Sequence, residues 1–157
     1  MKITFIMIGK TQASYLKEGM AAYSQRLTHY TQLQIIEIPA IKNSGSWSEE
    51  KLKNVEGEQL LAQLSGEEYL VLLDERGKMR NSSQFAEWIA GHQNRCLRHL
   101  AFMVGGAYGF SDALYAVGKE KFSLSAMTFS HQILRLIFLE QLYRAYSILN
   151  NHPYHHN

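Results

Sequence analysis

The sequence predicts an α/β fold in which helices sandwich a mostly parallel β-sheet. Apolar runs of strand length alternate along the chain with stretches in which apolar residues recur at helical spacing, and glycine-containing or polar turns separate them. No internal repeat, low-complexity tract or long linker interrupts this alternation. Residues 1–157 are therefore expected to form a single domain.

Five segments are expected to form strands. The first, Lys2 to Ile8, is almost continuously apolar, which is typical of a strand covered on both faces of a parallel sheet. The second ends before Pro39, and the polar run Asp74 to Lys78 is expected to form a turn after the third. The expected strands span residues 2–8, 33–38, 69–73, 100–104 and 122–125.

Five further segments are expected to form helices. Apolar residues follow helical spacing between Gln12 and Tyr30. The sequence from Ser46 to Glu49 has the capping-box pattern that opens a helix, and Ser82 or Ser83 can cap the next one. The expected helices span residues 12–30, 49–64, 83–93, 111–117 and 130–149.

Composition narrows the class of protein. With 46% hydrophobic residues and 2 prolines, the chain has the composition of a packed globular protein rather than a disordered one. The single cysteine, Cys96, excludes an internal disulfide and fits a reducing compartment. No apolar segment reaches the roughly 18 residues of a membrane helix, and Ile3 to Ile8 is too short for a signal-peptide core. We therefore expect a soluble, cytoplasmic protein without a membrane partner.

Charge is distributed unevenly along the chain. Residues 1–75 hold 7 Lys and Arg against 10 Asp and Glu, whereas residues 76–157 hold 9 against 4, together with 6 of the 7 histidines. This asymmetry suggests one basic face that could meet phosphate. An accidental imbalance on a solvated surface explains it equally well.

Ligands of parallel α/β sheets bind beyond the carboxyl ends of the strands. Leu73, Gly105 and the run Leu124 to Phe129 all lie at or just beyond the carboxyl ends of expected strands, so three segments could meet at one pocket. The last run offers backbone amides and carbonyls that could bond an adenine edge, and apolar walls come from Leu124, Met127 and Phe129.

The glycine-rich turn from Gly105 to Gly109 permits positive φ angles and close approach by a ligand. It does not match the G-x-G-x-x-G dinucleotide pattern, and the chain contains no G-x-x-x-x-G-K-[ST] phosphate loop. Taken alone, this turn and the run at residues 124–129 could each be a plain turn without a ligand.

The last expected helix is apolar around most of its circumference. A small domain cannot hide all faces of such a helix, so the sequence predicts a homodimer. Glu140 and Arg144 are spaced i, i+4 and could form an exposed ion pair or position a substrate. In the tail, Tyr154 and His155 could stack on RNA bases, although a disordered terminus is the alternative. No metal-ligand spacing is present, and no metal is expected.

Several motifs also carry a resemblance to a known family. They are Met1 to Thr4 with Ile8-Gly9-Lys10, Ile35 to Pro39, Glu56-Gly57-Glu58, Leu73 to Lys78, Val104-Gly105-Gly106 with Gly109, Leu124 to Phe129, Glu140 to Ala145, and His152 to His155. In this order, over essentially the whole chain, they closely resemble the ribosomal RNA large subunit methyltransferase H family of the SPOUT class.

The resemblance implies a SPOUT-type α/β domain with a C-terminal trefoil knot, working as a homodimer. It also implies S-adenosylmethionine as methyl donor and, as acceptor, N3 of a pseudouridine in helix 69 of 23S rRNA within the assembled ribosome. The family usually has proline where this chain has Ser130; serine is a good helix cap, so little loss is expected. By position, the cofactor-binding residues are Leu73, Gly105, Leu124, Ser125, Ala126, Met127, Thr128 and Phe129.

Methyl transfer needs the acceptor nitrogen in line with the methyl carbon, and an imide N3 must also lose its proton. The candidates for substrate positioning or proton handling are Glu140, Arg144, Tyr154 and His155. We hypothesise that one subunit supplies the cofactor pocket and the other subunit's tail helps to seat the RNA. Two rival functions are a non-catalytic ribosome-binding module and a dimeric nucleotide-dependent oxidoreductase, although the missing dinucleotide fingerprint counts against the second.

Overall fold

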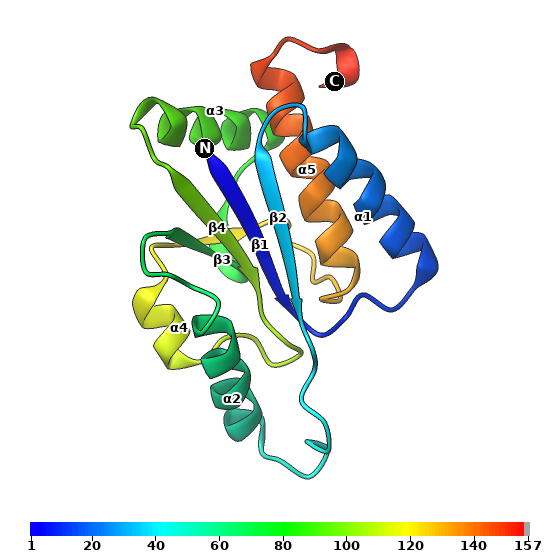
Figure 1. The fold of residues 1–157 in the computed structure, drawn as a ribbon, viewed down its shortest axis with the longest axis vertical. Helices are drawn as coiled ribbons and strands as arrows, with labels where there is room; N and C mark the ends of the chain where they lie inside the picture. The colour runs from blue at the N-terminus through cyan, green and yellow to red at the C-terminus, as the bar shows by residue number, and fades with distance from the viewer. Residues whose placement is uncertain (156–157) are drawn as a thin grey trace.

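The structure, a computed structural model, describes residues 1–155, with the side chains of residues 1–154, as an α/β sandwich (Figure 1). In chain order its elements are β1 (Lys2–Ile8), α1 (Ser14–Leu27), β2 (Gln32–Ile38), α2 (Glu49–Leu61), β3 (Tyr69–Met79), α3 (Ser82–Asn94), β4 (His99–Val104), α4 (Asp112–Val117), β5 (Glu120–Ser123), α5 (Ile133–Leu149) and a 3₁₀ turn (Pro153–His155).

All strand pairings in the sheet are parallel, and the strand order is β2-β1-β4-β3-β5. β1 lies between β2 and β4, with Phe5 opposite Ile35 of β2 on one side and Phe102 of β4 on the other. Every residue from Ile3 to Ile8 is buried, which explains why this strand is apolar without alternation. The predicted α/β fold with a parallel sheet is confirmed.

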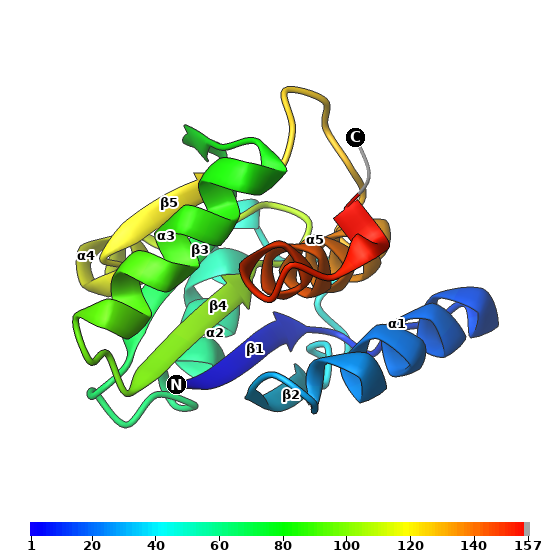
Figure 2. The same ribbon diagram turned by 90° about the horizontal axis from the view of Figure 1, so that it is seen from above.

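Helices cover both faces of the sheet. α5 packs between α1 and α3 on one face, and α2 packs against α4 on the other (Figures 1 and 2). Alternate strand residues supply two apolar cores, because successive side chains of a strand point to opposite faces. Phe5 and Phe102 belong to the core under α5, and Ile6 and Met103 to the core under α2.

β3 continues beyond its predicted end. Phe122 of β5 pairs with both Leu73 and Lys78, so the residues between those two positions leave the ladder as a bulge. The prediction that β3 ends at Leu73 and that a turn follows from Asp74 to Lys78 is therefore wrong, because the strand resumes and runs to Met79. The hydrophobic pattern could not reveal the continuation, because the bulged residues are polar.

Two helix starts also differ from the prediction. α5 begins at Ile133 instead of Ser130, but the Ser130 Oγ accepts a hydrogen bond from the Ile133 N–H at 3.4 Å and so caps the preceding turn as a serine can. The cap of α2 is Ser48 rather than Ser46, because the Ser48 side chain accepts a bond from the Lys51 N–H.

The apolar helix α5 is better covered than the sequence suggested. Each of its residues is buried or half-buried within the single chain, because α1 and α3 flank it. Its composition therefore no longer requires a second subunit, and the case for a homodimer depends on other features. The trefoil knot stays a prediction. No helix in residues 1–155 has both the length and the apolar character needed to cross a bilayer.

Candidate functional site

A cavity of about 430 Å³ lies at the carboxyl ends of β3, β4 and β5. The parallel sheet brings these ends to one edge, which is where ligands of such sheets bind. Its wall is formed by the β3 bulge, the turn after β4 and the segment between β5 and α5, namely residues 73–76, 104–110, 115, 122–125, 127–131 and 134.

The three segments that the sequence singled out all border this cavity. Seven of the eight predicted cofactor-binding residues line it: Leu73, Gly105, Leu124, Ser125, Met127, Thr128 and Phe129. Ala126 is exposed and is not among the lining residues. The Met127 side chain is 75% exposed, so it stands at the rim rather than forming an enclosed wall as expected.

The glycine turn has the close backbone packing that its sequence predicted. The Gly109 N–H donates a 3.1 Å hydrogen bond to the Gly106 carbonyl, and Gly109 has a φ of +83°, which side-chain-bearing residues rarely adopt. A Cβ on Gly105 would lie only 2.8 Å from the Gly109 carbonyl oxygen. The turn can therefore present bare backbone to the cavity.

Asp74 and Tyr115 form a polar part of the wall that the sequence analysis did not single out. The Tyr115 hydroxyl donates a hydrogen bond to Asp74 Oδ2, and the Arg76 N–H donates to Oδ1 at 2.8 Å. Burial, followed by the bond to Asp74, raises the pKa of Tyr115 to about 12. The hydroxyl is therefore protonated at neutral pH and fixes the carboxylate of the β3 bulge.

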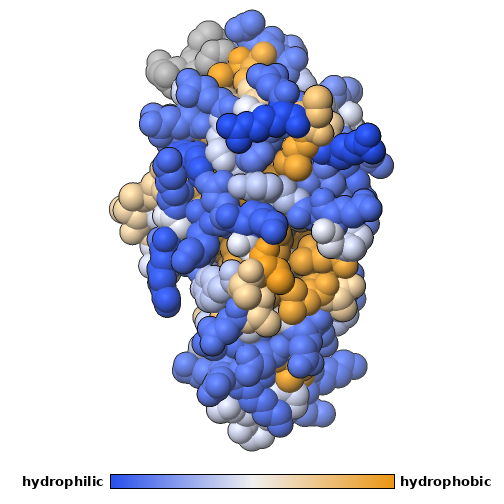
Figure 3. All heavy atoms as spheres, turned by 90° about the vertical axis from the view of Figure 1, so that its left-hand side faces the viewer, coloured by the Kyte–Doolittle hydropathy of each residue, from blue (hydrophilic) through white to orange (hydrophobic). Residues whose placement is uncertain are grey.

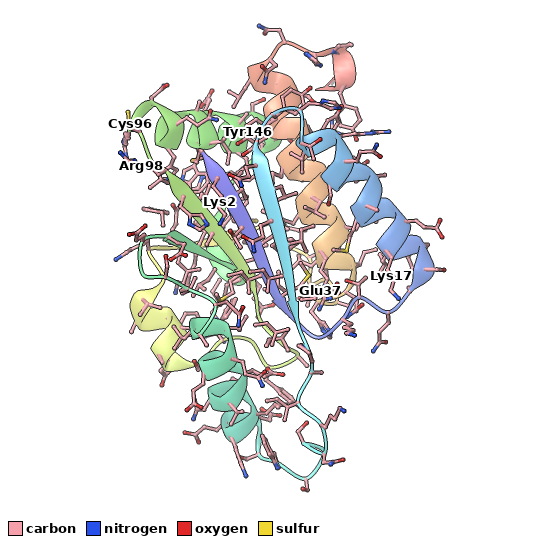
Figure 4. All side chains as sticks on the ribbon, in the orientation of Figure 1. Lys2, Lys17, Glu37, Cys96, Arg98 and Tyr146 are labelled. Carbon is pink, nitrogen blue, oxygen red and sulfur yellow. The ribbon has the colours of Figure 1, made fainter. Side chains whose placement is uncertain are left out.

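Arg135 holds the start of α5 against the sheet. Its guanidinium is completely buried and donates to the carbonyl oxygens of His131, Ile8 and Gly9, at 3.1, 2.5 and 2.9 Å. Glu37 Oε1 lies 3.5 Å from its Nη1. Figure 4 shows Glu37 at the carboxyl end of the sheet, opposite the end that carries Lys2 and Arg98.

Through Arg135, the cavity-lining residue His131 is tied to the ends of β1 and β2. Burial and then the Arg135 charge lower the pKa of His131, which favours a neutral imidazole at this wall. Neither residue was among the predicted site residues. The signal in the sequence was an arginine between apolar residues of the last helix, whose charge had to find partners.

A second polar group, which we call the α5 cluster, consists of Glu140, Arg144 and Tyr154. The Arg144 guanidinium donates two hydrogen bonds to Glu140 Oε1, at 3.0 and 2.7 Å, and the Tyr154 hydroxyl donates to the same oxygen at 3.1 Å. Tyr23 of α1 lies 3.0 Å from the Tyr154 hydroxyl. The ion pair between Glu140 and Arg144 is half-buried rather than exposed as expected. The structure thus brings three of the four predicted catalytic residues together.

Hydrogen bonding and burial shift the pKa values of Arg144 and Tyr154 in this cluster. The bonds to Glu140 are the largest cause of a raised pKa for Arg144, and burial is the largest cause of a raised pKa for Tyr154. The arginine is therefore cationic and the phenol protonated at neutral pH. The fourth predicted residue, His155, has a side chain that lies outside the described part of the chain.

The cavity and the α5 cluster are separate within one chain. None of the cluster residues lines the cavity, and Glu140 stands six positions after Leu134, the last lining residue, which is about 9 Å along a helix. Among the described residues, no group of three or more His, Cys, Asp or Glu is arranged to hold a metal ion. The geometry thus offers a small-molecule cavity and, apart from it, a cationic hydrogen-bonding cluster.

Comparison with known proteins places this geometry in a family. The family described as "Predicted SPOUT methyltransferase" matches residues 1–155. The chain belongs to the SPOUT methyltransferase family. It is 52% identical over 156 residues to a Parabacteroides distasonis protein named Ribosomal RNA large subunit methyltransferase H, with 99% of each chain covered. A Christiangramia forsetii protein of the same name is 45% identical, again over 99% of each chain.

A solved structure gives independent support for the fold. A probable methylase family protein from Haemophilus influenzae superposes with a TM-score of 0.56, covering 99% of this chain and 70% of that one. Since the sequence identity is 13%, this likeness shows the fold alone.

Proposed function

We propose that this chain is a 23S rRNA methyltransferase that acts in the assembled ribosome. The donor is S-adenosylmethionine, and the acceptor is N3 of a pseudouridine in helix 69. One observation carries the proposal: three segments that are distant in the sequence meet around one cavity, in a chain that shares 52% of its residues with a named rRNA methyltransferase.

The cavity suits the proposed donor. A volume of about 430 Å³ lies within the roughly 300–1,000 Å³ of small-molecule sites. The backbone of residues 124–129 and the apolar side chains of Leu73 and Leu124 would hold the adenosine part. Asp74 and Glu75 outnumber the one lining arginine, Arg76, so the charge on the wall is negative on balance, which favours a cation. When bound, S-adenosylmethionine supplies a methyl group on a positively charged sulfur.

The α5 cluster supplies the groups that the acceptor needs. An imide nitrogen becomes negatively charged as it loses its proton, and the Arg144 cation would stabilise that charge. Tyr154 donates its only hydroxyl proton to Glu140, so it would contact the base through its ring, and Glu140 holds both side chains in place. His155 is a further candidate for proton handling.

A homodimer reconciles the two separate sites. Within one chain the α5 cluster does not face the cavity, so we propose that the cluster of one subunit completes the cavity of the other. The exposed Met127 and Tyr108 at the cavity rim support such an interface. Figure 3 shows that apolar groups also gather near the middle of one side of the molecule, within an otherwise hydrophilic surface.

Mixed dimers test this division. Leu124→Trp would fill the cavity, and Tyr154→Phe would disable the cluster. If each site combines two chains, random mixing of the two inactive variants restores about a quarter of wild-type activity, because half of the dimers are mixed and each has one intact site. No recovery in verified mixed dimers would contradict the shared site.

The proposed reaction is tested on ribosomes. Nucleoside mass spectrometry of rRNA from cells lacking this protein should show an unmethylated pseudouridine in helix 69, and the purified protein should restore the methyl group. The modest net charge of +2 leads us to expect slower methylation of protein-free rRNA than of intact particles. Faster methylation of free rRNA would refute that expectation.

Binding measurements separate the two rival functions. Calorimetry should detect binding of S-adenosylmethionine and S-adenosylhomocysteine but not of NAD. Binding of NAD alone would favour a nucleotide-dependent oxidoreductase. Ribosome binding without affinity for any of the three would favour a non-catalytic module.

A further inference from the structure

Glu56 of α2 is a buried acid that the proposed chemistry does not use. Glu56 is only 7% exposed, and its Oε2 atom is buried without a hydrogen-bond partner. Such atoms are rare in folded proteins, and each one calls for a physical explanation. Burial raises the pKa of Glu56, as expected for a carboxyl group removed from water.

The carboxyl group of Glu56 lies against the glycine turn of the cavity. A Cβ built on Gly106 would be 2.3 Å from Glu56 Oε2 and 2.8 Å from both Oε1 and Cδ. Gly106 itself lines the cavity, so Glu56 stands directly behind the cavity wall. Only a residue without a side chain can occupy position 106 while Glu56 keeps this place.

The position of Glu56 is fixed by the helix that carries it. At the next residue, a Cβ on Gly57 would be 2.2 Å from the Ser111 Oγ, so α2 also packs closely against the residues that follow the turn. Ser111 is buried and caps α4 through the Leu114 N–H. Consecutive residues of α2 thus contact the glycine turn and the start of α4.

We propose that Glu56 is a positioning residue of the donor site, which sets the backbone of the Gly105–Gly109 turn from behind. This inference rests on the proposed function, since the donor is S-adenosylmethionine. The two carboxyl oxygens face the turn, whose backbone N–H groups are the natural donors for them. The Oε2 atom, which has no partner, can accept a hydrogen bond from the turn when the bound S-adenosylmethionine orders it.

Glu56→Gln separates positioning from stability. Glutamine keeps the shape of the side chain but replaces one acceptor oxygen by a donor, and a neutral amide is easier to bury than a carboxylate. The Tm should therefore stay the same or rise, while calorimetry shows an affinity for S-adenosylmethionine about 5-fold weaker. Glu58→Gln, at an exposed position of the same helix, is the matched control and should change neither value.

A double-mutant cycle tests the contact itself. Gly106→Ala should weaken binding of S-adenosylmethionine by about 10-fold or more, because the new methyl group meets the Glu56 carboxyl group. In a Glu56→Ala background the same change should weaken binding by no more than about 2-fold. Gly91→Ala, where a Cβ meets nothing within 4 Å, serves as the control for a glycine substitution.

Each outcome has a definite consequence. The positioning role is overturned if Glu56→Gln binds S-adenosylmethionine with wild-type affinity, or if its affinity and Tm fall together. It is also overturned if Gly106→Ala weakens binding equally in the wild-type and Glu56→Ala backgrounds. If Gly106→Ala does not fold, Glu56→Gln decides. A wild-type protein that binds neither S-adenosylmethionine nor S-adenosylhomocysteine overturns the proposed function itself, whereas normal wild-type binding with silent variants overturns Glu56 alone.

Discussion

The Tyr154 hydroxyl and the Arg144 guanidinium share one acceptor, the Oε1 atom of Glu140, at distances of 3.1 Å for the hydroxyl and 2.7 Å for Nη2. A residue from the C-terminal tail is thereby joined to an ion pair on α5. The carboxylate orients both groups that the proposed reaction would use on the base.

Substitution of Glu140 should therefore affect turnover more than donor binding. Glu140→Gln weakens the hold on Arg144 and Tyr154 but leaves the cavity intact, because Glu140 does not line it. We expect kcat on ribosomes to fall about 100-fold with S-adenosylmethionine affinity unchanged. Glu18→Gln, exposed on α1, is the control. A variant that loses donor affinity in proportion to kcat would contradict the separation of the two sites.

Arg135 should be among the residues most important for stability. Arg135→Met leaves the Ile8 and Gly9 carbonyls and the Glu37 carboxylate without their buried donor, so the free energy of unfolding should fall by about 3–5 kcal/mol. Urea unfolding measures the loss. Arg95→Met removes an exposed arginine and should change stability by no more than about 0.5 kcal/mol. Similar losses in the two variants would show that the buried contacts contribute little.

The bond between Tyr115 and Asp74 should influence donor affinity. Tyr115→Phe removes the side-chain hydrogen bond to Asp74, leaves the one from the Arg76 N–H, and so loosens the β3 bulge at the cavity wall. Hydrogen bonds to charged groups contribute about 1.5–3 kcal/mol to stability. Because the bulge lines the cavity, part of this free energy should be lost from the binding of S-adenosylmethionine, whose Kd should rise about 5-fold. Tyr15→Phe changes a tyrosine that is 65% exposed and serves as control. An unaltered Kd would place Asp74 outside the donor's reach.

His92 should make stability depend on pH. Its imidazole is buried among aromatic rings, 4.3 Å from Trp88 and 4.6 Å from Tyr69 between centroids, and burial lowers its pKa below 6.5. Glu120 opposes this shift, whereas Arg95 and Arg80 add to it. The folded state thus binds fewer protons than the unfolded state.

The stabilisation that follows is present above the unfolded pKa of about 6.5 and is lost as pH falls through the folded pKa. His92→Gln cannot titrate, so its stability should decline less than that of the wild type between neutral and mildly acidic pH. Chemical denaturation at a series of pH values compares the two. His99, whose pKa burial also lowers, leaves part of the decline in the variant. Parallel pH profiles would rule out a contribution from His92.

Much of the site could be predicted because it depends on strand ends. The strands preceding Leu73 and Gly105 are short apolar runs, and parallel strands bring such ends together whatever their order. Glu56 and the Tyr115–Asp74 bond depend instead on which helix covers which face and on a bulge in β3. A hydrophobic pattern carries no information about those arrangements.

The homodimer stays a prediction, but the burial of α5 shows another limit of sequence patterns. An apolar circumference identifies α5 as buried but not what buries it, and in the structure two helices of the same chain do so. Similarly, Arg135 stands between apolar neighbours without any local sign of its partners. Those partners lie 126 and 127 positions earlier in the chain.

That long separation bears on how the protein is made. During translation, the carbonyl groups at the end of the first strand emerge early, but the guanidinium that satisfies them follows only after 127 further residues have been added. A nascent chain cannot finish its sheet edge before its last helix leaves the exit tunnel. A product truncated before Arg135 would lack this donor and should consequently be unstable.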